Sequence, residues 1–131
     1  NYNSSALTYK CVDSIYKYIK IPFEIIVVDN NSHSQDFSKL EGLRNRVDAL
    51  VQSKYNGGFG AGNMLGANIS RGQYLCFINS DVEFVEDCVT PLCLYLDENP
   101  NVGCITPQQC NKDGEPVDSF SHSNGIRHEL L

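Results

Sequence analysis

The chain has 131 residues and a formal net charge of −6, and its sequence pI is about 4.9. This length predicts one domain with a real hydrophobic core. The acidic balance disfavours nucleic acid and anionic membrane surfaces as main partners, because both select for clustered Lys and Arg. No apolar run approaches the roughly 18 residues that span a bilayer, so we expect a soluble chain.

The six cysteines are interpreted as free thiols. Four of them fall within apolar runs, where cysteine behaves as a small core residue: Cys11, Cys76, Cys93 and Cys104. No Cys-x-x-Cys pair occurs, which disfavours a zinc site. The cysteine usage therefore predicts a reducing compartment.

The first half of the chain is predicted to alternate helices with buried strands. Ser4 or Ser5 can cap a first helix, which Pro22 stops. A continuous apolar run over residues 24–28 predicts a strand covered on both faces. The next elements expected are a short helix over residues 38–46 that opens with a capping box at Ser38, and a weak strand over residues 48–51. The glycine-rich residues 56–63 then lead into a helix with Ala61, Leu65 and Ile69 on one face, which ends at Gly72.

The second half is organised around residues 74–78, an unbroken apolar run that predicts a central buried strand. This run ends in Asn79-Ser80-Asp81, and ligands of open α/β sheets collect outside the carboxyl ends of the strands. Asp81 is therefore a candidate site residue, although it can alternatively cap the next segment. The later elements expected are a helix that starts at Thr90-Pro91 and ends at Asn99, a strand over residues 102–106, and a hairpin turn at residues 112–114 within a hairpin and tail that cover residues 111–131.

This order predicts an α/β fold with a mostly parallel central sheet and helices on both faces. The glycine-rich segment does not match a dinucleotide fingerprint, since Gly58-Phe59-Gly60 is followed by Asn63. A P-loop is excluded because no Gly-Lys-Ser/Thr occurs in the chain. The glycines can let backbone N–H groups approach a ligand, or they can form no more than a flexible turn.

Four stretches together resemble the successive motifs of the family 2 glycosyltransferases, and most closely the rhamnosyltransferase-like enzymes of bacterial surface-polysaccharide synthesis. They are Tyr2-Asn3-Ser4-Ser5, Ile26-Val27-Val28-Asp29-Asn30-Asn31-Ser32, the segment from Asn56 to Gly66, and Phe77-Ile78-Asn79-Ser80-Asp81-Val82. The resemblance implies a Rossmann-like GT-A-type fold truncated at both ends, so that residues 1–131 form a single partial domain that binds the nucleotide sugar. It also implies a cytoplasmic location, including the inner face of the membrane.

The resemblance further implies transfer of a sugar, with inversion, from a UDP- or dTDP-sugar donor to a saccharide or lipid-linked acceptor, with Mg²⁺ or Mn²⁺ as cofactor. Asp81 falls at the family's metal position. The residues that fall at donor-nucleotide positions are Tyr2, Asn3, Asp29, Asn31, Asn56, Gly58, Asn63 and Asn79. A carboxylate such as Asp29 can accept hydrogen bonds from a base or ribose, although a cap or turn role is the alternative.

Two departures from the family pattern matter. The first acidic residue of the metal signature is Asn79 here, which leaves metal binding to Asp81 with help from Glu83. The general base expected for inversion would lie beyond Leu131, so we expect the 131-residue chain alone to be catalytically inadequate. A non-catalytic nucleotide-sugar-binding module is the alternative function, and a sugar nucleotidyltransferase is a third. Unpaired strand edges predict self-association.

Overall fold

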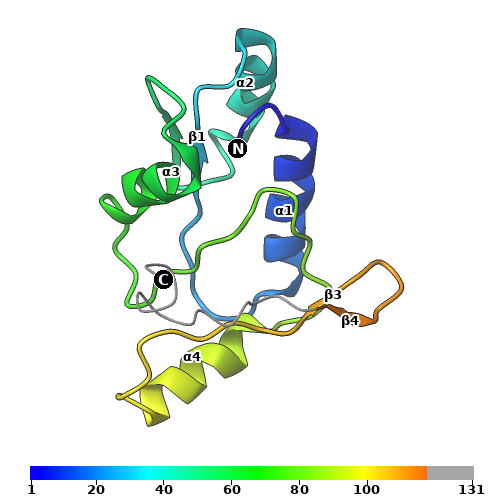
Figure 1. The fold of residues 1–131 in the computed structure, drawn as a ribbon, viewed down its shortest axis with the longest axis vertical. Helices are drawn as coiled ribbons and strands as arrows, with labels where there is room; N and C mark the ends of the chain where they lie inside the picture. The colour runs from blue at the N-terminus through cyan, green and yellow to red at the C-terminus, as the bar shows by residue number, and fades with distance from the viewer. Residues whose placement is uncertain (118–131) are drawn as a thin grey trace, which may run out of the picture.

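The computed structural model describes residues 1–117, and the predicted tail beyond them lies outside the described residues. Figure 1 shows an N-terminal part built from helices and a small sheet, and a later part that crosses the middle of the view and continues below into a helix and a hairpin. The elements, in order, are α1 (Ser5–Tyr18), β1 (Ile26–Asp29), α2 (Ser34–Leu40), a 3-10 turn (Glu41–Leu43), β2 (Ala49–Gln52), α3 (Gly58–Ala67), α4 (Val89–Glu98), β3 (Gln109–Cys110) and β4 (Pro116–Val117).

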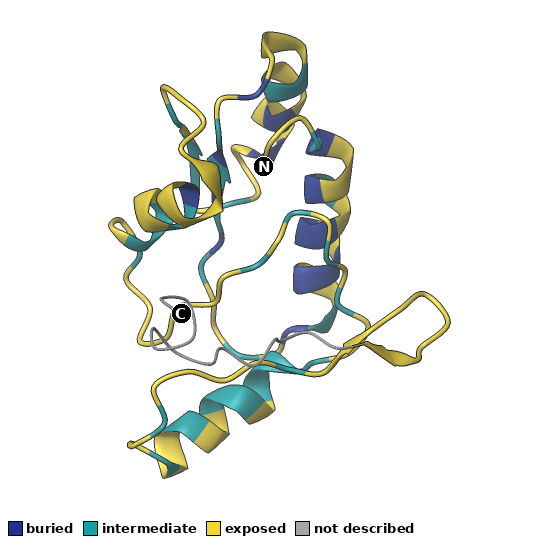
Figure 2. Ribbon diagram, viewed as in Figure 1, coloured by how far each residue is buried: buried dark blue, intermediate teal, exposed yellow. Residues whose placement is uncertain are grey.

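The best-packed core lies between α1, α2 and β1. Leu40 and Leu43 are fully buried, and they belong to one cluster with side chains of α1 and β1 such as Val12 and Val27. Figure 2 shows the buried residues of α1 along the side that faces β1. The predicted first helix is confirmed, because its apolar residues recur on a single face as helical periodicity requires.

β1 and β2 pair in parallel, with Ile26 opposite Ala49 and Asp29 opposite Gln52. The two faces of β1 meet different helices. Val27 joins the α1 cluster, whereas on the other face a Cβ placed on Gly66 of α3 would lie 3.3 Å from Val28 and 3.6 Å from Ile26. The predicted fold class, α/β with a parallel sheet and helices, is therefore confirmed. β1 begins two residues later than predicted and alternates between half-buried and buried positions.

Asn1 extends this sheet on the side of β1 opposite β2. Its backbone nitrogen donates to the Val28 carbonyl at 2.7 Å, and its carbonyl accepts from the Asn30 N–H at 2.8 Å. This pair of bonds is the pattern of a parallel bridge, with Asn1 beside Asp29. The first residues of the chain are thereby fixed next to the end of β1.

The short helix predicted over residues 38–46 starts four residues earlier, at Ser34. Ser38 is not a cap, because its hydroxyl donates back to the Ser34 carbonyl at 2.8 Å inside the helix. The helix start is instead tied to α1 by Asp36, whose Oδ1 accepts from the backbone N–H and the hydroxyl of Ser5. A contact between distant segments therefore set this boundary, and the local capping pattern was misleading.

The prediction of a central buried strand over residues 74–78 is wrong for the described structure. The segment is unpaired and crosses the middle of the molecule, and Tyr74, Leu75 and Phe77 are exposed by 36%, 51% and 54%. An apolar run forms a strand only where neighbouring strands satisfy its backbone N–H and C=O groups. Within residues 1–117 no strand pairs with this run.

Further along, the strand predicted over residues 102–106 is also absent from the described structure, for the same reason. α4 begins at Val89, so Pro91 occupies its third position rather than its first. Asp87 holds the start of α4, since its carboxylate accepts from the backbone N–H and the hydroxyl of Thr90. The predicted hairpin turn is confirmed between β3 and β4, with Gly114 at φ 81°.

Among the described residues, no helix has the length and apolar character needed to cross a bilayer.

Candidate nucleotide-binding site

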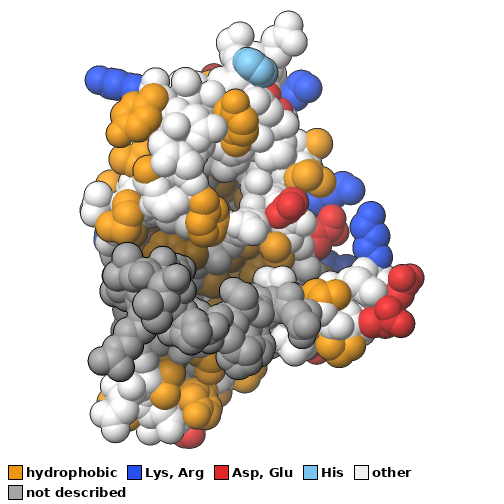
Figure 3. Space-filling model, viewed as in Figure 1, with side chains coloured by type: hydrophobic (Ala, Val, Ile, Leu, Met, Phe, Trp, Pro, Cys, Tyr) orange, Lys and Arg blue, Asp and Glu red, His pale blue; other side chains and the backbone are white. Residues whose placement is uncertain are grey.

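The candidate site is a hollow of about 1050 Å³ that opens beside the carboxyl end of β1. Its walls are apolar side chains of α1, of the segment that leads into β1 and of residues 74–78, and Figure 3 shows such side chains inside the hollowed face. Six of the sequence-predicted site residues line it: Tyr2, Asn56, Gly58, Asn63, Asn79 and Asp81. Asn3, Asp29 and Asn31 are not among the lining residues.

Asp29, the last residue of β1, is fully buried. Its Oδ1 accepts from the Ser32 hydroxyl at 2.5 Å and from the Asn1 side-chain amide at 2.8 Å, and its Oδ2 accepts from the Ser32 N–H at 3.1 Å. Both carboxylate oxygens therefore have partners within the chain. In this structure Asp29 organises the turn after β1, and Asn31 follows it with φ 63°, a left-handed conformation that Asn tolerates.

The first motif is fixed against this turn. The Asn3 N–H donates to the Ser32 hydroxyl at 2.8 Å, and the Asn3 side chain accepts from the His33 N–H at 2.8 Å. On the other side, the hydroxyls of Ser4 and Ser80 lie 3.1 Å apart. This hydrogen bond joins the first motif to the turn that carries Asp81, two segments far apart in the sequence.

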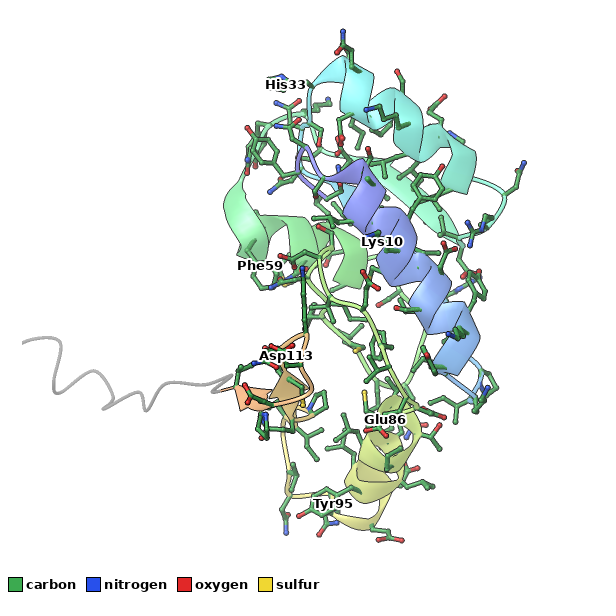
Figure 4. All side chains as sticks on the ribbon, turned by 90° about the vertical axis from the view of Figure 1, so that its right-hand side faces the viewer. Lys10, His33, Phe59, Glu86, Tyr95 and Asp113 are labelled. Atoms are coloured by element: carbon green, nitrogen blue, oxygen red, sulfur yellow. The ribbon has the colours of Figure 1, made fainter. Side chains whose placement is uncertain are left out.

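The glycine-rich loop is attached to the end of β1 by Asn30. The Asn30 Nδ2 donates to the Asn56 side-chain oxygen and to the Gly58 carbonyl, both at 2.9 Å. α3 then starts at Gly58, whose φ of 80° favours glycine. Phe59 is 63% exposed and also lines the hollow, so it lies at the rim, at the start of α3 as Figure 4 shows.

Asn79, Asp81 and Glu83 are all exposed. The turn is closed by a bond from the Val82 N–H to the Asn79 carbonyl at 3.1 Å. Exposed carboxylate and amide oxygens are ligands that suit Mg²⁺ or Mn²⁺, which keep several waters and share substrate phosphates. Asp81, Glu83 and Asn79 therefore offer oxygen atoms of the kind that such a cation binds. The described residues contain no group of three or more His, Cys, Asp or Glu side chains placed to hold a metal ion.

Two ionisable groups next to the hollow are shifted by their surroundings. Burial, reinforced by the nearby Asp81 carboxylate, raises the pKa of the Cys11 thiol to about 11. Burial also opposes ionisation of Asp36, but hydrogen bonds from Ser5 and Asn1 outweigh it and hold the pKa of Asp36 below its ordinary value of 3.8. Cys11 is therefore a neutral thiol and Asp36 a carboxylate near neutral pH.

Sequence reasoning missed Asn30, Ser32 and Asp36. Asn30 and Ser32 lie inside the motif that follows β1, and that position was the signal available for them. Asp36 carried no such signal, because its partners are Ser5 and Asn1, about 30 residues earlier in the chain.

Comparison with solved structures shows the same fold in a glycosyltransferase. A crystal structure of residues 1–349 of TarS from Staphylococcus aureus matches with a TM-score of 0.64 and 26% identity, covering 76% of this chain and 31% of that one. A structure of the same TarS segment in complex with UDP matches with a TM-score of 0.62 and 24% identity, covering 76% and 31%.

Sequence comparison identifies relatives that are much longer than this chain. TarS of Staphylococcus aureus, a poly(ribitol-phosphate) beta-N-acetylglucosaminyltransferase, is 25% identical over 127 residues, which are 93% of this chain and 22% of TarS. An uncharacterized protein of Sinorhizobium fredii, y4gI, is 33% identical over 97 residues, which are 70% of this chain and 10% of that protein. The family model of glycosyl transferase family 2 matches residues 1–129. The chain therefore belongs to glycosyl transferase family 2.

Proposed function

We propose that the protein transfers a sugar from a nucleoside-diphosphate sugar to an acceptor hydroxyl, with inversion. The observation that carries this proposal is that residues from all four family motifs line one hollow beside the end of β1. Ligands of α/β sheets bind at this kind of edge. Membership of the family and the TarS likeness support glycosyl transfer, and the activity is proposed for the whole protein because the chain spans only 10–22% of the relatives' lengths described above.

The donor is proposed to be a UDP- or dTDP-sugar. Tyr2, Asn56, Gly58 and Asn63 would contact the nucleoside from the rim of the hollow, and the TarS complex with UDP supports a uridine nucleotide. Asp29 has both oxygens engaged by Ser32 and Asn1, so its part would be to hold the turn that carries Asn31 beside the donor.

A divalent metal, Mg²⁺ or Mn²⁺, is proposed to bind at Asp81, with Glu83 as the nearest carboxylate along the chain and Asn79 as a neutral oxygen donor. When bound, such a cation would neutralise the charge that builds up on the departing diphosphate. Asp81 would hold the diphosphate end of the donor at the site. The Ser4–Ser80 hydrogen bond would keep Asp81 next to the nucleoside-binding residues.

The acceptor is proposed to be a saccharide or a lipid-linked saccharide of bacterial surface-polysaccharide synthesis, on the cytoplasmic side. Inversion needs a carboxylate that removes the proton of the acceptor hydroxyl as it attacks. We assign that role to no residue of this chain and propose that it lies in a segment after Leu131. All six cysteines are free, which supports a reducing location. Self-association remains a prediction.

A nucleotide-sugar-binding module without catalysis is the second candidate. The observation that favours it is Asn79, which occupies the position of the first acidic residue of the metal signature. The two candidates differ in turnover: the enzyme releases nucleoside diphosphate when it is given a donor and an acceptor, whereas the binding module does not.

Isothermal titration of the protein with UDP, dTDP and GDP, each with and without Mn²⁺, tests nucleotide binding, which both candidate functions require. We expect binding of UDP or dTDP that strengthens with Mn²⁺ and falls at least about tenfold in Asp81→Asn, because a carboxylate ligand to the metal is lost. Asp113→Asn is the matched control: it makes the same charge change on the β3–β4 hairpin and should bind as the wild type does. Failure of all three nucleotides to bind would overturn the proposal.

A further inference from the structure

We propose that Asn30 is a positioning residue that clamps the glycine-rich loop onto the end of β1 and thereby sets the affinity for nucleotide. The effect on nucleotide affinity rests on the proposed function, whereas the clamp itself does not. Asn30 is absent from the set of residues that the family motifs assign to nucleotide contacts. Its side chain reaches across to a loop more than 25 residues later in the chain.

Every polar atom of the Asn30 amide has a partner in that loop. Nδ2 donates both of its hydrogens, to the Asn56 side-chain oxygen and to the Gly58 carbonyl, each at 2.9 Å. Oδ1 accepts from the Gly57 N–H at 3.3 Å. The loop is therefore held at three successive residues by one side chain.

The chemistry of these partners requires an amide. A backbone carbonyl such as that of Gly58 can only accept, and the Gly57 N–H can only donate, so the side chain must offer both a donor and an acceptor. Asn56 is oriented as well, because its Oδ1 also accepts from the Gly58 N–H at 2.9 Å. An aspartate at position 30 would keep the acceptor but replace both donor bonds with contacts between oxygens.

The Asn30 side chain also lies beside α3, close to Gly62. A Cβ placed on Gly62, which is buried in α3, would lie 3.7 Å from both Cγ and Nδ2 of Asn30. The Asn30 backbone N–H is also engaged, since it donates to the Asn1 carbonyl at 2.8 Å. One residue thus connects the first motif, the end of β1, the glycine-rich loop and α3.

The consequence concerns the predicted nucleotide contacts at Asn56, Gly58 and Asn63. All three lie on the loop and on the first turns of α3, so their positions depend on how firmly the loop is held. Binding to a loop that must first be ordered carries the entropy cost of ordering it, and pre-organisation removes that cost. Loss of the clamp should therefore weaken nucleotide binding although Asn30 itself need not touch the nucleotide.

The test compares Asn30→Ala and Asn30→Asp with Gln35→Glu, an exposed amide-to-acid change on α2. Backbone ¹⁵N relaxation of the nucleotide-free protein should give Gly57 and Gly58 order parameters near 0.85 in the wild type and below about 0.6 in both Asn30 variants. Asn56→Asp retains the oxygen that accepts from Asn30, so the loop should stay ordered there. Gln35→Glu should leave the loop unchanged.

Titration with UDP and Mn²⁺ completes the test. We expect both Asn30 variants to bind at least about tenfold more weakly and Gln35→Glu to bind as the wild type does. Asn30→Ala adds no charge, so its loss cannot come from repulsion of the diphosphate. Unchanged order at Gly57 and Gly58 would overturn the clamp, and a loosened loop with full affinity would overturn its effect on binding. A loosened loop in the Asn30 variants of a protein whose wild type binds none of UDP, dTDP and GDP would instead refute the proposed function and leave the clamp standing.

Discussion

Two regions of the molecule contrast in how they bury apolar side chains. In residues 1–52, the packed region, Leu40 and Leu43 are fully enclosed between two helices and a strand. In residues 73–117, the open region, Leu75 and Phe77 are 51% and 54% exposed and Leu94 of α4 is 57% exposed. Figure 2 shows the same contrast along the ribbon. Similar apolar content therefore gives a close-packed core in one region and the lining of a hollow in the other.

The open region is attached to the packed one mainly through α1. The Ser14 hydroxyl accepts from the Phe84 N–H at 3.0 Å, the Cys11 thiol lies 4.0 Å from the Asn79 carbonyl, and Ser4 bonds Ser80. These contacts determine where Asp81 lies relative to the end of β1. The candidate site thus lies where the packed region meets residues 79–84, which are held to it by these few polar contacts.

The largest expected difference between the two regions is the loss of stability when a buried side chain is truncated. Leu40→Ala should lower the free energy of unfolding by about 2–5 kcal/mol, because the side chain is fully buried and its removal leaves a cavity. Leu94→Ala on α4 is the matched control and should change it by no more than about 0.5 kcal/mol. Urea denaturation of both variants measures this difference, and equal losses would show that the two regions are packed alike.

The next largest difference is expected between the alkylation rates of Cys11 in the packed region and Cys110 in the open region. Raising the pKa of Cys11 from 9.0 to about 11 lowers its thiolate fraction about 100-fold near neutral pH, and burial slows access further. Cys110 on β3 is exposed. Timed alkylation followed by mass spectrometry should therefore label Cys110 at least about 100-fold faster than Cys11. Comparable alkylation rates for the two cysteines would contradict the burial of Cys11 on the side of α1 that faces the core.

A smaller effect is expected at Asp36, which ties α2 to α1. Its pKa is held below 3.8, so its carboxylate contributes stability at pH values above 3.8, and this contribution is lost as the pH falls through the lowered value. Asp36→Asn should cost about 1 kcal/mol at neutral pH, a modest figure because the side chain is partly exposed. Stability curves of the two proteins should converge below pH 3.8. If the difference in unfolding free energy between the wild type and Asp36→Asn stayed constant with pH, the Asp36 carboxylate would not be the stabilising group.

The sequence predicted those elements whose signals are local. α1, β1, β2 and the β3–β4 turn follow from periodicity, apolar runs and glycine positions within each segment. The helix of α3 was predicted, but it begins within the glycine-rich residues, at Gly58, and ends at Ala67 rather than at Gly72. Residues 74–78 were misread because an apolar run does not reveal whether partner strands are present. The site was predicted in outline by the strand ends, yet Asn30 and Asp36 were missed because their roles depend on partners more than 25 residues away.

The measurement that tests the central claim most directly is hydrogen–deuterium exchange of the protein with and without UDP and Mn²⁺. The nucleotide should slow exchange in peptides that cover residues 28–32, 56–63 and 79–81, since these segments meet at the hollow beside β1. The hairpin of β3 and β4 should be unaffected. Binding of UDP that protects the hairpin or α4 and leaves those three segments unchanged would contradict the site proposed here.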